Sequence, residues 1–154
     1  MEEDEYKTTY NALASVRCIF EKALTNHQAR CSLATHFCLA DREGYSCADE
    51  VSSSKCKEML TRLRENSIFV LKLHDVKGPL PHNMEIRVQA GGMAGLAKLV
   101  SDHIDKVSSD DSVIDIHQVI RRSEEKFGDV ESLPFNEIIQ SVLQFQGRRR
   151  KQRK

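Results

Sequence analysis

The chain has 154 residues, 40% hydrophobic and 30% charged, and its 23 basic side chains balance 23 acidic ones. This length suits one globular domain with a hydrophobic core and is short for two. No apolar run approaches the ~20 residues that cross a bilayer, and the acidic residues 2–5 differ from the basic start of a secretory signal, so we expect a soluble protein with no membrane partner.

The first half of the chain predicts two helices and a strand. Apolar residues recur at spacings of three and four over residues 5–26, which indicates a helix. Residues 31–40 alternate as a strand does, and the turn-forming residues 41–44 are expected to end it. A second helix is predicted over residues 47–66, where Met59 lies on an inward apolar stripe.

A β-hairpin is predicted in the middle of the chain. Residues 68–74 are apolar on both faces, as in a central strand covered on both sides. Residues 84–90 alternate apolar and polar side chains, as in a strand with one face in water. The proline-containing residues 77–83 form the expected loop, because proline lacks the donor of a β-ladder.

The last third of the chain predicts helices. Helical spacing resumes over residues 93–107 and again over residues 113–127, with Gly128 as the stop. A terminal helix is expected over residues 134–146, where Pro134 fits the first turn.

The expected fold class is α+β, in a single domain over residues 1–146. The element order is helix, strand, helix, strand, strand, helix, helix, helix. This order predicts a small mixed or antiparallel sheet of three strands, with the helices largely on one face.

The cysteines raise the question of a metal. Five cysteines, an odd number, all lie within the first 56 residues, which favours reduced thiols over a disulfide framework. Thiolates and imidazoles are the ligands that zinc prefers, although zinc ligands usually come in pairs about two to four residues apart. The cysteines lack that spacing, because six, eight and eight residues separate them in turn, whereas His36 and Cys38 share one strand face and could supply two ligands. The candidate residues are Cys31, His36, Cys38, Cys47 and Cys56. Core packing of free thiols is therefore favoured, no metal or cofactor is predicted, and a zinc site stays open as an alternative.

No catalytic residue is predicted. The glycine-rich residues 91–95 lie between a predicted strand and a predicted helix, as phosphate-binding turns do. They lack the lysine and hydroxyl residue of a P-loop, so a turn that lets elements pack closely is favoured. Because no nucleophile or base lies in a recognisable motif, we expect a protein that is not an enzyme.

The predicted terminal helix has an apolar stripe with two interpretations. It either packs on its own domain, which is favoured because a short chain needs the buried area, or fills the groove of a partner protein. The stripe consists of Phe135, Ile138, Ile139, Val142 and Phe145.

The strongest charge feature is a basic tail, predicted to be disordered over residues 147–154 because its like charges repel. Its basic side chains are Arg148, Arg149, Arg150, Lys151, Arg153 and Lys154. Such runs are read by nuclear import receptors and also neutralise nucleic-acid phosphates. We therefore expect a nuclear protein, shuttling with the cytoplasm or resident, that acts as an adaptor or small subunit of a nuclear complex by binding a protein. The alternative is a sequence-nonspecific nucleic-acid-binding factor that uses the tail. The sequence sets no oligomeric state.

Overall fold

The structure is a computed structural model that describes residues 3–13, 16–72, 80–100 and 114–145. Helices dominate these parts, and the strands form two sheets of two strands each. An α+β fold is confirmed. The expected three-stranded sheet is not found among the described residues, which contain one antiparallel and one parallel pair.

The first predicted helix is divided. Helix α1 spans Glu3–Leu13 and the short helix α2 spans Glu21–Thr25. Between them the backbone N–H of Cys18 donates to the carbonyl of Tyr45 at 3.0 Å. A single helix over residues 5–26 is therefore wrong, because this part of the chain bonds to a strand instead of to its own preceding turn.

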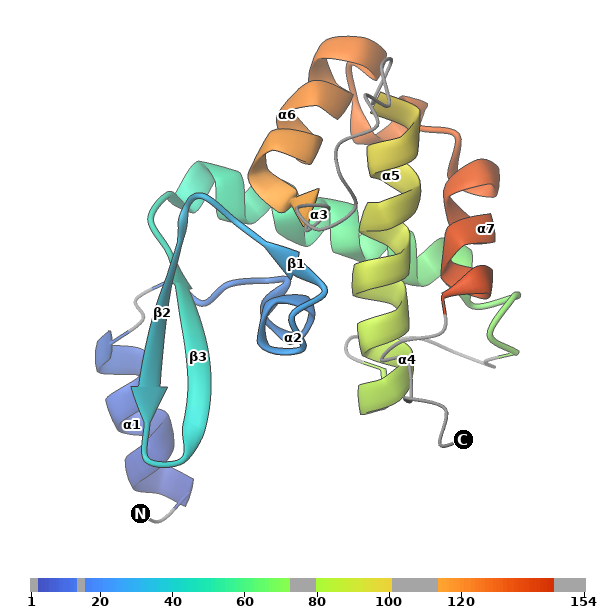
Figure 1. The fold of residues 1–154 in the computed structure, drawn as a ribbon. Helices are drawn as coiled ribbons and strands as arrows, with labels where there is room; N and C mark the ends of the chain where they lie inside the picture. The colour runs from blue at the N-terminus through green and yellow to red at the C-terminus, as the bar shows by residue number, and fades with distance from the viewer. Residues whose placement is uncertain (1–2, 14–15, 73–79, 101–113, 146–154) are drawn as a thin grey trace, which may run out of the picture.

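A hairpin follows. Strand β2 (Ala34–Leu39) pairs antiparallel with β3 (Arg42–Cys47). The connecting turn contains Ala40, whose φ of 55° is left-handed, as tight two-residue hairpin turns require. The predicted strand is confirmed, whereas the expected turn over residues 41–44 lies mostly within β3. In Figure 1 this hairpin lies with α1 on one side of the molecule.

Helix α3 (Glu50–Ser67) confirms the second predicted helix. The Asp49 carboxylate caps its start by accepting a hydrogen bond from the N–H of Ser52 at 3.2 Å. Of the predicted inward stripe, Met59, Leu60 and Leu63 are each at most 1% exposed, and Cys56 is half-buried.

The predicted central hairpin is wrong. The part of residues 68–74 that the structure describes, up to Lys72, is a turn after α3, in which the N–H of Leu71 donates to the Ser67 carbonyl at 3.0 Å. The second predicted strand, residues 84–90, is helical. The loop expected before it lies partly outside the described residues and ends earlier, because helix begins at His82.

One continuous helix replaces that strand. It consists of α4 (His82–Ile86), a π-helical turn η1 (Arg87–Gly91) and α5 (Gly92–Val100). Residues 101–107 of the predicted third helix lie outside the described residues. Gly91 and Gly92 are therefore helical residues and do not end a strand.

The glycines of this helix allow close contact with α7 (Phe135–Gln144). A Cβ atom at Gly91 would lie 2.9 Å from the Cα of Val142, and one at Gly95 would lie 2.8 Å from the Ile138 carbonyl oxygen. Both distances are shorter than side-chain contacts allow. The close packing expected of this glycine-rich segment exists, but it joins two helices and not a helix and a sheet.

The remaining elements close the core. Helix α6 (Ile116–Phe127) ends at Gly128, whose φ is 85°, as predicted. A 3-10 turn, η3 (Val130–Ser132), leads toward α7. The parallel strands β1 (Ala29–Arg30) and β4 (Ile114–Asp115) join the N-terminal part to the start of α6.

The hydrophobic core lies among α2, α3, α5, α6 and α7, and Figure 1 shows α5 between α6 and α7. Its fully buried large side chains include Phe20, Met59, Leu63, Met93, Leu96 and Ile138. Among the described residues, no helix combines the length and the apolar content needed to cross a membrane.

Candidate functional site

The predicted site residues fall into three places. The six basic side chains from Arg148 to Lys154 lie outside the described residues, so their contacts stay a prediction. The predicted tail, residues 147–154, lies there with them.

The apolar stripe of α7 faces the protein's own core. Ile138, Ile139 and Val142 are buried, and Phe135 and Phe145 are half-buried against the same core. They pack mainly against α5, η1 and α3. The favoured interpretation, self-packing, is the one observed.

Four of the five cysteines come together. Cys31, Cys47 and Cys56 line one small pocket with His117, and Cys18 is close enough to interact electrostatically with all three. All five cysteines are free thiols. Cys38 is different, because it is exposed on the β2–β3 hairpin, on the same strand as His36.

The zinc candidates are therefore divided between two places. His36 lies 3.5 Å from the Glu43 carboxylate on the hairpin and is not among the side chains that line the pocket of Cys31. Within the described residues, no three His, Cys, Asp or Glu side chains are placed to hold a metal ion. The zinc candidates did not include Cys18, which is 13 residues before Cys31, or His117, which is 61 residues after Cys56.

Three of the clustered thiols, Cys18, Cys31 and Cys56, have raised pKa values. Burial raises the pKa of Cys18 and of Cys56 to about 12, and the neighbouring thiols add to the shift. Burial also raises the pKa of Cys31. Their pocket holds about 40 Å³, room for about one water molecule. A protonated thiol is a weak nucleophile, so Cys18 and Cys56 act as packing residues.

A larger pocket of about 340 Å³ lies between α2, α3 and the α4–η1 helix, and we call it the basic pocket. Seven of its ten lining residues are charged or carry a side-chain amide. Its residues are Arg17, Cys18, Ile19, Glu21, Lys22, Lys57, Leu60, Arg64, Glu85 and Gln89.

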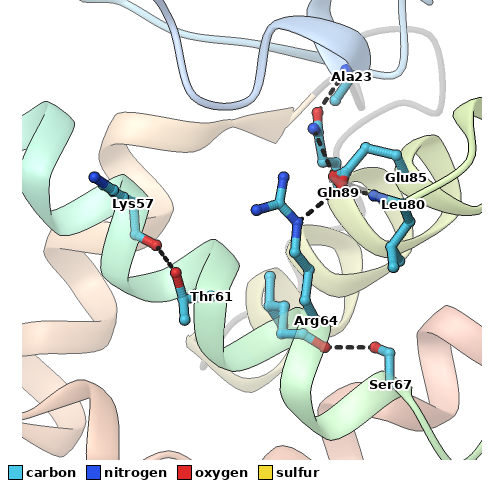
Figure 2. Close-up of polar contacts among 9 residues, drawn as sticks. Ala23, Lys57, Thr61, Arg64, Ser67, Leu80, Glu85 and Gln89 are labelled. Carbon is cyan, nitrogen blue, oxygen red and sulfur yellow. Dashed lines mark hydrogen bonds and ion pairs between the residues drawn. The ribbon is translucent and has the colours of Figure 1, made fainter. Parts of the chain in front are cut away.

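A buried polar network forms one wall of the basic pocket (Figure 2). The Glu85 carboxylate, 1% exposed, accepts hydrogen bonds from Arg64 Nε at 2.8 Å and from the N–H of Leu80 at 3.1 Å. It also accepts from the side-chain amide of Gln89 at 3.0 Å. Gln89 in turn accepts from the N–H of Ala23 at 3.0 Å. The network joins α2, α3 and the α4–η1 helix, and among the described residues none of its fully buried side-chain nitrogens and oxygens lacks a hydrogen-bond partner.

Positive charge exceeds negative charge around the basic pocket, since four basic side chains line it against two carboxylates. Glu85 pairs with Arg64, and Glu21 pairs with Arg17 at 2.9 Å. In the described part of the chain, Lys22 and Lys57 have no carboxylate partner within ion-pair distance. The pocket therefore attracts anions.

No protein-family model, curated protein or solved structure matches this chain. Function consequently has to be argued from the residues of its surface and pockets.

Proposed function

We propose that the protein is a non-enzymatic adaptor or small subunit of a nuclear complex. Its folded body binds a partner protein, and its basic residues 148–154 bind an import receptor or phosphates. The observation that carries this proposal is the exposure of Phe69, whose side chain is 93% accessible to solvent.

Phe69 is presented by an ordered turn at the end of α3. The N–H of Lys72 donates to the Phe69 carbonyl at 3.2 Å, and Lys72 has a left-handed φ of 56°. Leu71 anchors the turn because its side chain is buried at 8% exposure. Exposed aromatic side chains on ordered backbone are typical anchors of protein interfaces, where they fill a partner's pocket.

The buried ionisable groups also support a binding role. Glu85 accepts three hydrogen bonds within the protein, so its carboxylate is engaged in holding helices together. The raised pKa values of Cys18 and Cys56 keep their thiols protonated. General bases and nucleophiles need the opposite, a free lone pair near neutral pH.

The test is affinity purification from cells, after nuclease digestion, with Phe69→Ala. Removing the aromatic ring should reduce recovery of the partner proteins at least about tenfold, as for an interface hot spot. Val51→Ala is the matched control, because Val51 is also an exposed apolar residue of the α3 region, at 64% exposure. Equal recovery with Phe69→Ala and with the unmodified chain would contradict the proposal.

A sequence-nonspecific nucleic-acid-binding factor is the second candidate, and the basic pocket is the observation that favours it. Under this alternative, the co-purified proteins are held through nucleic acid, so nuclease digestion removes them from the purified sample. Affinity for nucleic acid then falls steeply with salt, because each phosphate contact releases counterions.

A further inference from the structure

We propose that the basic pocket binds a phosphate group, held by Arg64 together with Lys57 and Lys22. The inference goes beyond the adaptor role, because neither the Phe69 surface nor residues 148–154 line this pocket. For the second candidate, it names the residues that would bind the phosphate.

Arg64 presents a fixed donor group to the pocket. Its Nε is bound by Glu85, and its two terminal nitrogens form no hydrogen bond with any described residue. In Figure 2 these nitrogens point away from Glu85. The side chain is only 18% exposed, so its donors lie in a partly dry site. A planar guanidinium fork matches two oxygens of a phosphate.

The network behind Arg64 fixes its orientation. Glu85 is itself held by the N–H of Leu80 and by Gln89, and Gln89 is held by the backbone of Ala23. Binding therefore costs little side-chain entropy at Arg64, because its guanidinium is already oriented without a ligand.

The lysines supply the second part of the charge. Lys57 is exposed on α3 and Lys22 is half-exposed on α2, so both ammonium groups can move toward a ligand. The carboxylates that face the same pocket, Glu21 and Glu85, are each paired with an arginine. A phosphate would thus meet an oriented guanidinium and two ammonium groups that have no carboxylate partner among the described residues.

The rest of the lining suits a phosphate attached to an organic group. Ile19 and Leu60 give the pocket an apolar wall, and its 340 Å³ exceeds the space that an inorganic phosphate ion fills. Two sources share this chemistry: a phosphodiester of a nucleic-acid backbone and a small phosphorylated metabolite.

The test is an NMR titration of the full chain at constant ionic strength. Inorganic phosphate is the probe in one arm and a short single-stranded oligonucleotide is the probe in the other. The side-chain N–H signals of Arg64 and Gln89 report on this pocket, whereas contacts to residues 148–154 leave them unmoved. Saturable shifts of both signals are expected in at least one arm. Shifts with inorganic phosphate would identify the ligand as free phosphate or a phosphorylated metabolite. Shifts with the oligonucleotide alone would identify it as the phosphodiester backbone of a nucleic acid.

Two variants test the ligand residues. Arg64→Lys keeps the charge but loses the fork, and Lys57→Gln removes one unpaired charge at an exposed position. Each should weaken binding about tenfold, as expected for the loss of a hydrogen bond between charged groups. Lys98→Gln is the control, since it removes the same charge from an exposed position of α5 outside the pocket and should leave binding unchanged.

Either of two results would overturn the proposal. In one, neither probe shifts the Gln89 signal in a saturable manner. In the other, Lys57→Gln and Lys98→Gln weaken binding equally, which would mean that net charge alone attracts the probe. Because Lys57 has no ion pair within the described residues, Lys57→Gln remains informative even if Arg64→Lys disturbs the fold.

Discussion

At the scale of single residues, the Glu85 carboxylate connects α3 to the α4–η1 helix, and Gln89 extends the network to α2. A buried charge is costly unless its partners replace the lost water, and here a guanidinium, a backbone N–H and a side-chain amide do so. The same contacts orient Arg64 toward the basic pocket. A structural ion pair and a candidate ligand-binding group are therefore parts of one arrangement.

The cysteines also differ from one another residue by residue. Cys38 is exposed on the hairpin, whereas burial raises the pKa of Cys18 and of Cys56 to about 12. At pH 8 a disulfide reagent should modify Cys38 first. Cys18 and Cys56 should react at least ~100-fold more slowly, because almost none of either thiol is ionised.

Reaction rates measured by mass spectrometry check this prediction. The rates of Cys18 and Cys56 should rise as the pH approaches their raised pKa, and Cys38→Ser should remove the fast phase. If Cys18 reacted as fast in the native protein as in urea, its thiol would not be buried in the folded protein.

At the scale of elements, the contact between α5 and α7 depends on residues without side chains. The backbone of α7 leaves no space for a side chain at Gly95. A Cβ atom on Gly95 would lie only 2.8 Å from the Ile138 carbonyl oxygen. This approach lets the buried side chains Ile138 and Val142 reach the core. Helix–helix contact of this kind resists even a small added volume.

Gly95→Ala should lower the free energy of unfolding by about 1–3 kcal/mol, because two backbones must separate. Gly92→Ala is the matched comparison. The three atoms nearest to its added Cβ all belong to the Leu63 side chain, the nearest at 2.8 Å, and this side chain can change rotamer. Urea unfolding should therefore show a smaller loss for Gly92→Ala, and a larger loss there than at Gly95 would refute this account of the α5–α7 contact.

Two of the helices that sequence reasoning found, α3 and α6, combine long helical periodicity with clear ends. Helix α3 has an Asp49 cap, and α6 stops at Gly128 in a left-handed conformation. Strand β3 was missed because its sequence, from Arg42 to Cys47, has little apolar alternation. Local patterns thus sufficed where local chemistry set the element's boundaries.

The wrong strand over residues 84–90 has a long-range cause. Apolar and polar residues do alternate there, but Glu85 and Gln89 are four residues apart and share one face of a helix. Both are buried in contacts with Arg64 and Ala23. These partners lie 21 and 66 residues away in sequence, so no local pattern reveals the contacts. The alternation of apolar and polar residues over 84–90 therefore did not reflect a strand. The basic pocket could not be predicted either, because its residues come together only in the fold.

At the scale of the whole molecule, charge divides the chain into two unlike parts. Six of the 23 basic side chains lie in residues 148–154, and the rest of the chain holds 17 basic against 23 acidic ones. Within that net-acidic part, the basic pocket concentrates four cations at one place. We infer separate roles, protein recognition by the body and import or phosphate contact by the basic residues.

The most direct test of this division is partner recovery after nuclease digestion by a chain that lacks residues 148–154. We predict that the chain loses nuclear accumulation but retains, from lysates, the same partner proteins in the same amounts as the full chain. Loss of those proteins on removing residues 148–154, with their retention by Phe69→Ala, would contradict the account.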